Sequence, residues 1–178
     1  SVYGVKKERN VHEDMTLEPL TDYSKFKADC EVILSKYNSK EFTTVTLRPA
    51  TVCGYSTRQR LDVVVNILSN LAFHKRKITV FGGDQLRPNI HINDMVRAYE
   101  HILLEPDEKI SNKIFNVGFE NHTVMELANT TKQVIGDDVE LLLTPTDDNR
   151  SYHISSNKIR NELGFETKFT VEDAVNDL

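Results

Sequence analysis

The sequence has little of several features that mark whole classes of proteins. Its 178 residues include two cysteines, Cys30 and Cys53, with no Cys-x-x-Cys pair and no Cys/His cluster. This spacing argues against a disulfide framework and against a zinc or haem motif, and it favours a reducing compartment, so we expect a cytoplasmic protein. No stretch approaches about 18 uninterrupted apolar residues, so we expect no membrane-spanning helix.

Positive charge is also sparse. The formal net charge is −5, from 22 Lys and Arg against 27 Asp and Glu, and no run of five or more basic residues occurs. A protein that binds nucleic acid or an anionic membrane surface carries a basic footprint. We therefore expect neither nucleic acid nor a membrane as a partner, and a small-molecule ligand is favoured.

Glycine is scarce and is not spaced as a phosphate cradle. The seven glycines form neither Gly-x-Gly-x-x-Gly nor the relaxed Gly-x-x-Gly-x-x-Gly, the turn with which a dinucleotide-binding fold opens. The apolar start Ser1–Gly4 is typical of the last residues of a strand and has no Met or signal layout. We expect that a first mononucleotide-binding half belongs upstream of this chain.

The chain does contain alternating strand and helix patterns, and it is long enough for one substantial core. Runs rich in β-branched residues predict strands over 42–54, 78–83, 89–92, 114–118 and 139–143. Apolar residues at steps of three and four predict helices over 21–37, 61–73, 93–104, 123–136, 155–163 and 170–178. Such alternation favours an α/β protein with crossover connections and a mainly parallel sheet.

Capping residues indicate where several of these helices begin. A hydroxyl or carboxylate side chain at a helix start accepts hydrogen bonds from the free amides of the first turn. The candidates are Thr21 or Asp22, Asn93 or Asp94, and the capping-box pairs Thr123/Glu126 and Thr170/Asp173.

Tyr23 and Lys27 stand four residues apart at the start of the first helix, which places their side chains on one face, one turn from each other. A phenol has a pKa near ~10 and is a poor base at neutral pH. A cation about 6 Å away, at an effective dielectric constant of roughly 20, favours the phenolate by about 3 kcal/mol. The two residues are therefore a candidate acid/base pair that exchanges a proton with a substrate hydroxyl.

Spacing alone does not single out this pair, because Tyr3 and Lys7 are also four residues apart. Tyr3 precedes Gly4 in a segment that we expect to run from strand into loop, so its partner would not lie on a helical face. Tyr23 opens a capped amphipathic helix, which favours Tyr23. In the structural alternative, Tyr23 packs in the core and Lys27 is solvated.

Further motifs follow in a fixed order along nearly the whole chain. They are Val2-Tyr-Gly4, the Tyr23–Lys27 helix, Leu47-Arg48-Pro49, the segment Arg87-Pro-Asn-Ile-His-Ile-Asn-Asp94, Asn116-Val-Gly118 and a late Arg150. This order resembles the extended short-chain dehydrogenase/reductase family, which comprises nucleoside-diphosphate-sugar epimerases and dehydratases. The joint pattern is far more specific than any single motif in it.

The resemblance implies roles for residues at the matched positions. Tyr23 is the acid/base, and Lys27 holds the nicotinamide ribose and tunes Tyr23. Pro49 and Val52 are implied to contact the cofactor, which is NAD, with NADP not excluded.

The resemblance also implies a substrate, a nucleoside-diphosphate sugar. Arg87 and Arg150 are implied to grip its diphosphate, since a planar guanidinium matches phosphate oxygens. Arg60 is a weaker candidate for a substrate contact, and Thr51 stands where several epimerases carry a substrate-binding Asn. His91 alternates with apolar neighbours on a predicted strand, so we expect it to be structural.

The implied fold is the C-terminal part of a Rossmann-type doubly wound parallel sheet with a small α/β substrate-binding subdomain. Residues 1–80 would form the second half of the NAD-binding domain. They would be interleaved with residues 81–178, which would form mainly the substrate-binding subdomain. Family members often dimerise through the helix that bears the Tyr and Lys, so we expect a homodimer of the full-length protein.

The function that the resemblance implies is NAD-dependent epimerisation of the sugar through a transient keto-sugar. Dehydratases and decarboxylases of the family usually carry Glu where this chain has Ser1, which favours an epimerase or a ketoreductase. We expect the chain alone to be inactive, because it lacks the Gly-rich turn. Two alternatives remain open at this point: a non-catalytic nucleotide-sugar or dinucleotide-binding module, and a fragment without a function of its own.

Overall fold

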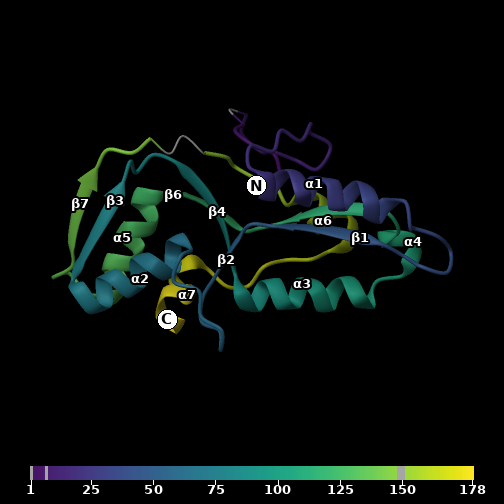
Figure 1. Cartoon of the computed structure of the whole chain (residues 1–178). Coiled ribbons are helices and arrows are strands. Elements are labelled where there is room, and N and C mark those ends of the chain that lie inside the picture. Colours follow the sequence, from purple (N-terminus) through teal and green to yellow (C-terminus); the bar gives the residue numbers. More distant parts are fainter. Residues whose placement is uncertain (1, 7, 148–150) are drawn as a thin grey trace.

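A computed structural model of the chain describes residues 2–6, 8–147 and 151–178, and Figure 1 shows its course. Its first elements are α1 (Asp22–Ser35), β1 (Val45–Pro49), β2 (Thr51–Cys53), α2 (Val64–Lys75), β3 (Lys77–Phe81), β4 (Leu86–His91) and α3 (Ile92–Leu104). They are followed by α4 (Asp107–Ile110), β5 (Lys113–Val117), β6 (Glu120–Thr123), α5 (Val124–Ile135), β7 (Glu140–Thr144), α6 (Asn157–Leu163) and α7 (Val171–Asp177).

The strands form three small sheets with mainly parallel pairing. β1 pairs with β5, β2 with β4, and β3 with β7, all in parallel, while β4 and β6 pair antiparallel. Each parallel pair joins strands that are distant in the sequence, with helices in the connections. The prediction of an α/β fold with a mainly parallel sheet is therefore confirmed.

Two hydrophobic clusters form the main cores. One contains Phe115 of β5 with the inner faces of α3 and α6, and the other contains Ile78 of β3 with the inner faces of α2, α5 and α7. These clusters correspond to the two ends of the molecule in Figure 1, with β2 and β4 between them. Both cores draw on residues before and after position 80, and the proposed boundary at that position stays a prediction.

Helix α1 begins where the sequence predicts. The Thr21 side chain caps it and accepts a hydrogen bond from the Ser24 amide. Most of its large apolar side chains, however, are exposed: 67% of the Tyr23 surface and 66% of the Phe26 surface are accessible. Ser24 is the buried residue of this helix, so the alternative in which Tyr23 packs in the core is wrong.

The predicted capping boxes are present at Thr123 and Thr170, but the predicted cap of α3 is wrong. His91 occupies that position, and its Nδ1 accepts a hydrogen bond from the Asn93 amide. Strand β4 leads directly into α3, so the helix begins before either predicted cap. Asp94 lies inside the helix, where its carboxylate binds the amides of a different segment.

Two short elements were not predicted, β6 and α4. β6 reads as a polar loop in the sequence, but it pairs with β4 from Leu86 to Asn89. This pairing also explains why β4 begins three residues before the predicted strand. Short polar strands are specified by their partner rather than by their own composition.

Among the described residues, no helix combines the length and the apolar character that a membrane span requires. Both cysteines are free thiols, with Cys30 exposed and Cys53 buried. The cytoplasmic location that their spacing favours stays a prediction.

Candidate active site

A cavity of about 730 Å³ brings together four of the residues singled out from the sequence. Tyr23 comes from the start of α1, Thr51 from β2, Arg60 from the loop before α2, and Arg87 from β4. These elements meet in the middle of the molecule, between its two cores (Figure 1). Another cavity, of about 580 Å³, is lined by none of the predicted site residues that the structure describes.

The lining of the larger cavity is mixed in character. Apolar side chains come mainly from α2 and its N-terminal flank, while polar groups come from the start of α1, the loop before α2, strands β2, β3 and β4, and the segments after β3 and β7. The apolar lining residues are Leu20, Val63, Val64, Ile67, Leu68, Leu71, Phe81 and Val124, and the polar ones include Gln85, Thr146 and Tyr152. Such a lining suits a ligand with ring faces to bury and polar or anionic groups to orient.

The helix start that carries Tyr23 is held in place by its neighbours. The hydroxyls of Thr21 and Ser24 lie 2.8 Å apart, and Ser24 is buried. Tyr23 thus projects from a fixed first turn into the cavity. Lys27, one turn further along, is exposed and is not among the residues that line the cavity.

The competing tyrosine, Tyr3, has a different environment. Its side chain is buried at 3% exposure, and its hydroxyl donates to Asn116 Oδ1 at 2.7 Å and accepts from Arg48 Nη1 at 2.7 Å. Burial raises the pKa of Tyr3, although the bond from Arg48 partly opposes this. Tyr3 is therefore a structural residue, and the prediction that favoured Tyr23 over Tyr3 fits the geometry.

Arg48 of the Leu-Arg-Pro motif fixes α1 against the sheet. Its Nε and Nη2 contact the Glu31 carboxylate at 2.6–3.2 Å, and both side chains are largely buried. Nη1 also donates to the Glu13 carbonyl. Glu31 lies one turn beyond Lys27, so this pair sets the position of the helix that carries Tyr23. Sequence reasoning assigned no role to Arg48, because neither partner is near it in the chain.

Two glycines of the sequence motifs lie where another segment approaches the backbone too closely for a Cβ atom. Gly4 has φ +71°, and a Cβ there would lie 2.1 Å from the Glu18 carbonyl oxygen. At Gly118 a Cβ would lie 2.7 Å from Ile154 and 3.0 Å from Ala50. The glycines of the Val-Tyr-Gly and Asn-Val-Gly segments thus allow tight packing.

The long motif from Arg87 to Asp94 divides into two roles. Arg87 lines the cavity. His91 is buried and stacks on Phe169 with ring centroids 4.8 Å apart. Asp94 is also buried, and it accepts hydrogen bonds from the amides of Lys168 and Phe169. The second part of the motif thus holds the C-terminal segment, and the prediction of a structural His91 agrees with its burial.

Arg60 is paired with a neighbour inside the cavity. Its Nε and Nη2 donate to the two carboxylate oxygens of Asp62 at 3.0 and 2.8 Å. The hydrogen bond to Asp62 and the charge of that carboxylate raise the pKa of Arg60. Arg60 therefore stays a cation.

Three of the predicted site residues do not reach the cavity in the described part of the chain. Lys27 and Pro49 are exposed, Val52 is half-buried, and none of the three lines the cavity. Arg150 lies outside the described residues. The roles proposed for all four stay predictions.

The groups that we expect to meet the ribose of a nicotinamide dinucleotide lie on α1. Tyr23 and Lys27 offer a hydroxyl and an ammonium from successive turns of α1, a donor set suited to a ribose. The glycines of the chain do not form the strand-to-helix turn that holds a pyrophosphate. That Tyr23 and Lys27 hold the nicotinamide ribose stays a prediction, and the chain supplies no Gly-rich cradle for the pyrophosphate.

A family model described as NAD dependent epimerase/dehydratase family matches residues 1–118. The chain belongs to this family. Among curated relatives of this epimerase/dehydratase chain, the UDP-glucose 4-epimerase of Lactobacillus helveticus is 26% identical over 197 residues, which cover 98% of this chain and 59% of the relative. The chain thus spans about three fifths of that relative's length.

Solved structures agree on the fold of this family member. The dTDP-glucose 4,6-dehydratase of Bacillus anthracis, in complex with NAD, has a TM-score of 0.82 at 22% identity, and the match covers 98% of this chain and 56% of that one. The UDP-glucuronic acid 4-epimerase of Bacillus cereus, in complex with UDP-glucuronic acid and NAD, has a TM-score of 0.84 at 23% identity, covering 99% and 57%. The RMD protein of Pseudomonas aeruginosa, complexed with NADPH, has a TM-score of 0.85 at 17% identity, covering 99% and 61%. The prediction of a partial Rossmann-type fold is confirmed.

Proposed function

We propose that this chain supplies the acid/base group and the substrate-binding cavity of an NAD-dependent nucleoside-diphosphate-sugar epimerase. The observation that carries the proposal is the shared cavity, in which Tyr23, Thr51, Arg60 and Arg87 meet from four separate elements. Family membership supports it, since the matched family model is that of NAD-dependent epimerases and dehydratases. We expect the chain by itself to be inactive, because no Gly-rich cradle is present to hold the cofactor pyrophosphate.

Tyr23 takes the central role in the proposed reaction. Tyr23 lies in the first turn of α1, and Lys27 stands one turn further along the same helix. Tyr23 removes the proton of a sugar hydroxyl and later returns it. Bound NAD would supply the hydride chemistry at the carbon that bears this hydroxyl, and return of hydrogen to the opposite face would invert that carbon.

The two arginines of the cavity bind the anionic part of the substrate. A planar guanidinium offers two parallel N–H donors to phosphate oxygens, and Arg60 and Arg87 enter the cavity from different elements. The apolar side chains of α2 cover the nucleoside or sugar ring and exclude water. Thr51 offers a hydroxyl for the sugar, and we propose Arg150 as a further contact to the diphosphate.

Ser1 favours an epimerase over a dehydratase, because the family's dehydratases usually carry Glu at that position. It lies outside the described residues, so this preference rests on the sequence. A ketoreductase or dehydratase of the same family uses the same Tyr and Lys and is the nearest alternative. The alternative from another class is a non-catalytic module that binds the nucleotide sugar or the dinucleotide.

We also propose that the full-length protein is a cytoplasmic homodimer that pairs through α1. The exposed Phe26 and Ile33, seven residues apart, lie on one side of this helix and belong to neither of the two main cores. Burial of such a surface is a usual driving force for association.

Replacement of Tyr23 by Phe tests the catalytic role. In a form extended by a dinucleotide-binding half, we expect Tyr23→Phe to lower kcat by 10²–10⁴-fold, a range typical of a lost acid/base group. Substrate affinity should be nearly unchanged, because the ring is kept. Tyr37→Phe is the matched control, since Tyr37 is also exposed and does not line the cavity. Turnover of UDP-glucose and UDP-glucuronic acid, followed by product analysis, is the measurement.

Two results would separate the alternatives. Unchanged turnover in the Tyr23→Phe variant would eliminate the proposed role of Tyr23. Tight binding of a nucleotide sugar, with no turnover in either form, would instead favour the non-catalytic module. Calorimetry of the present chain with NAD adds an independent check, since tight binding would contradict the expected lack of a pyrophosphate cradle.

A further inference from the structure

The guanidinium of Arg60, a candidate for anion binding, already binds a carboxylate of the protein itself. The Asp62 carboxylate meets its guanidinium side-on, with two hydrogen bonds at 3.0 and 2.8 Å. Phosphate oxygens bind a guanidinium through the same pair of parallel donors. A phosphate that approaches Arg60 must therefore displace Asp62 or share the guanidinium with it.

The backbone around this pair is held while its side chains are free to move. The buried Asn66 donates through Nδ2 to the Arg60 carbonyl at 2.8 Å and accepts from the Gly54 amide at 3.1 Å. The side chains of Arg60 and Asp62, by contrast, are 68% and 71% exposed. The exchange of Asp62 for another anion thus requires side-chain rotation alone.

Asp62 also changes the charge of the cavity. Among the described residues that line it, Arg60 and Arg87 are the basic side chains and Asp62 is the one carboxylate. The Arg60 hydrogen bond lowers the pKa of Asp62, so it is ionised at neutral pH. A diphosphate that approaches Arg60 therefore meets the negative charge of Asp62 beside the guanidinium.

We propose that Asp62 is an internal competitor for the anionic group of the substrate, and that it sets the affinity of the cavity for diphosphates by masking Arg60. This inference rests on the proposed function in assigning a nucleoside diphosphate to the cavity. In this proposal Asp62 keeps diphosphate binding weak enough for the substrate to leave again. In each binding event, Arg60 releases the Asp62 carboxylate and binds a phosphate in its place.

Calorimetric titration of the present chain with UDP and with inorganic pyrophosphate tests the proposal. An exposed ion pair opposes exchange by a modest amount, so we expect Asp62→Asn to bind both probes roughly two- to fivefold more tightly. Asp62→Glu, which keeps the charge, should bind like the wild type. Uridine, which lacks phosphate, should bind equally to all forms.

A second substitution assigns the gain to Arg60. In the double variant Arg60→Gln/Asp62→Asn the gain in UDP affinity should vanish, because the unmasked guanidinium is gone. Equal UDP affinity of the wild type and Asp62→Asn would overturn the proposal. So would a gain in affinity that persists in the double variant. The absence of UDP and pyrophosphate binding in every form would overturn it as well. A gain for Asp62→Asn without turnover in the extended form would uphold Asp62 as competitor while removing the epimerase function.

Discussion

Arg48 is the residue at which three separate parts of the chain are tied together. Its guanidinium contacts Glu31 on α1, the Tyr3 hydroxyl and the Glu13 carbonyl. The Glu13 side chain continues the network by accepting from the Asn116 amide on β5 at 2.7 Å. The position of α1, and with it that of Tyr23, thus depends on buried polar contacts.

Loss of one partner from this pair should be costly, because the other charge stays buried. We expect Glu31→Ala to lower the free energy of unfolding by about 3 kcal/mol, the lower end of the range for a broken buried pair. Urea denaturation followed by circular dichroism measures this. Asp29→Ala on the same helix is the control, and it should change stability by less than about 0.5 kcal/mol because Asp29 is exposed. Similar costs for the two variants would show that the Arg48 pair adds nothing.

Helix α5 shows how local signals place an element. The Thr123 hydroxyl accepts from the Glu126 amide, and the Glu126 carboxylate accepts from the Thr123 amide at 2.7 Å. Both partners of this capping box lie within one turn, so the sequence reveals it directly. The helix then packs against α2 and α7 in the core that forms one wall of the cavity.

This capping box gives the fold a pH dependence of known sign. The Thr123 amide holds the pKa of Glu126 below its ordinary value of 4.5. A pKa that is lower in the folded state than in the unfolded state adds stability above about pH 4.5, and this stability is lost as pH falls through the folded pKa. We expect Glu126→Gln to cost about 0.5 kcal/mol at pH 7, since the group is exposed and screened, and to cost less at pH 3.

Urea midpoints of the wild type and Glu126→Gln at pH 7 and pH 3 measure this difference. Glu100→Gln, an exposed change on α3, provides the control for the loss of one negative charge. A cost that does not shrink in acid would contradict the capping contribution.

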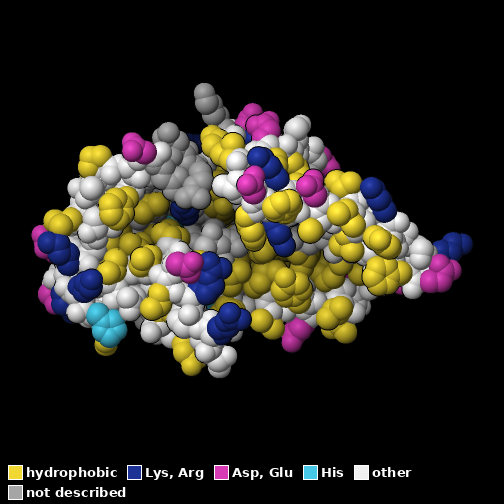
Figure 2. Space-filling model, viewed as in Figure 1, with side chains coloured by type: hydrophobic (Ala, Val, Ile, Leu, Met, Phe, Trp, Pro, Cys, Tyr) yellow, Lys and Arg dark blue, Asp and Glu magenta, His cyan; other side chains and the backbone are white. Residues whose placement is uncertain are grey.

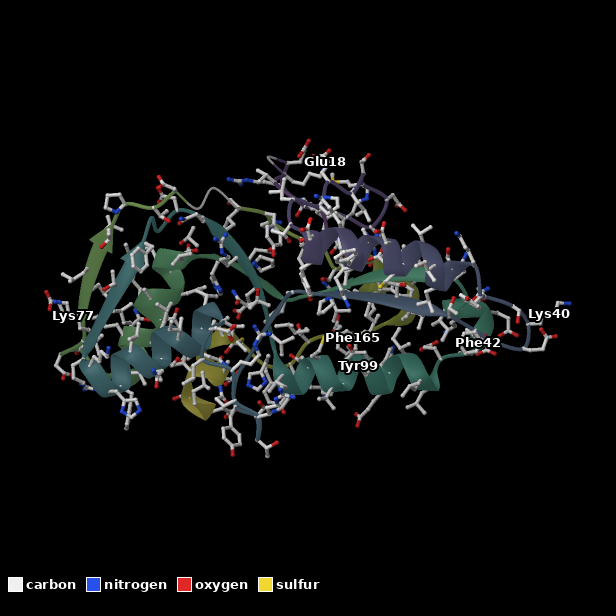
Figure 3. The ribbon with its side chains drawn as sticks, in the orientation of Figure 1. Glu18, Lys40, Phe42, Lys77, Tyr99 and Phe165 are labelled. Carbon is white, nitrogen blue, oxygen red and sulfur yellow. The ribbon has the colours of Figure 1, made fainter. Side chains whose placement is uncertain are left out.

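At the scale of the whole molecule, one face is strongly apolar. Figure 2 shows hydrophobic side chains gathered between α1 and α3, around β1. Figure 3 places Tyr99 on the side of α3 that faces β1 and Phe42 near α4, and both are more than half exposed. In the described chain β1 pairs with β5 and with no strand on its other side. An exposed strand edge flanked by apolar side chains favours association.

We therefore expect the isolated chain to self-associate as its concentration rises. The double substitution Phe42→Ser/Tyr99→Ser should reduce the associated fraction, because it removes two aromatic side chains from this face. Light scattering coupled to size-exclusion chromatography measures the mass over a concentration series. Phe73→Ser, at an exposed position on α2, is the control. A monomer at every concentration, or an equal effect of the control, would contradict the prediction.

The sequence by itself determined the elements whose signals are local. The Thr21 cap, the two capping boxes and the alternation of strands and helices depend on residues a few positions apart, and the structure contains them. The resemblance added Thr51, Arg60 and Arg87 to Tyr23 as site residues, and these four share one cavity. Their chemical roles stay predictions.

The tertiary structure alone decided which residues distant in the sequence contact each other. Tyr3 and Tyr23 have the same spacing to a lysine. The hydroxyl of Tyr3, however, is buried against Arg48 and Asn116, which lie 45 and 113 positions further along the chain. Tyr23 lines the cavity instead. The sequence predicts Asp94 as a possible helix cap, but its carboxylate binds backbone amides 74 and 75 positions away. Asp62 and Arg60 are close in the sequence, but only the tertiary structure shows that both line the cavity. The physical reason is that hydrogen bonds and burial depend on which segments meet in space, which local propensity does not specify.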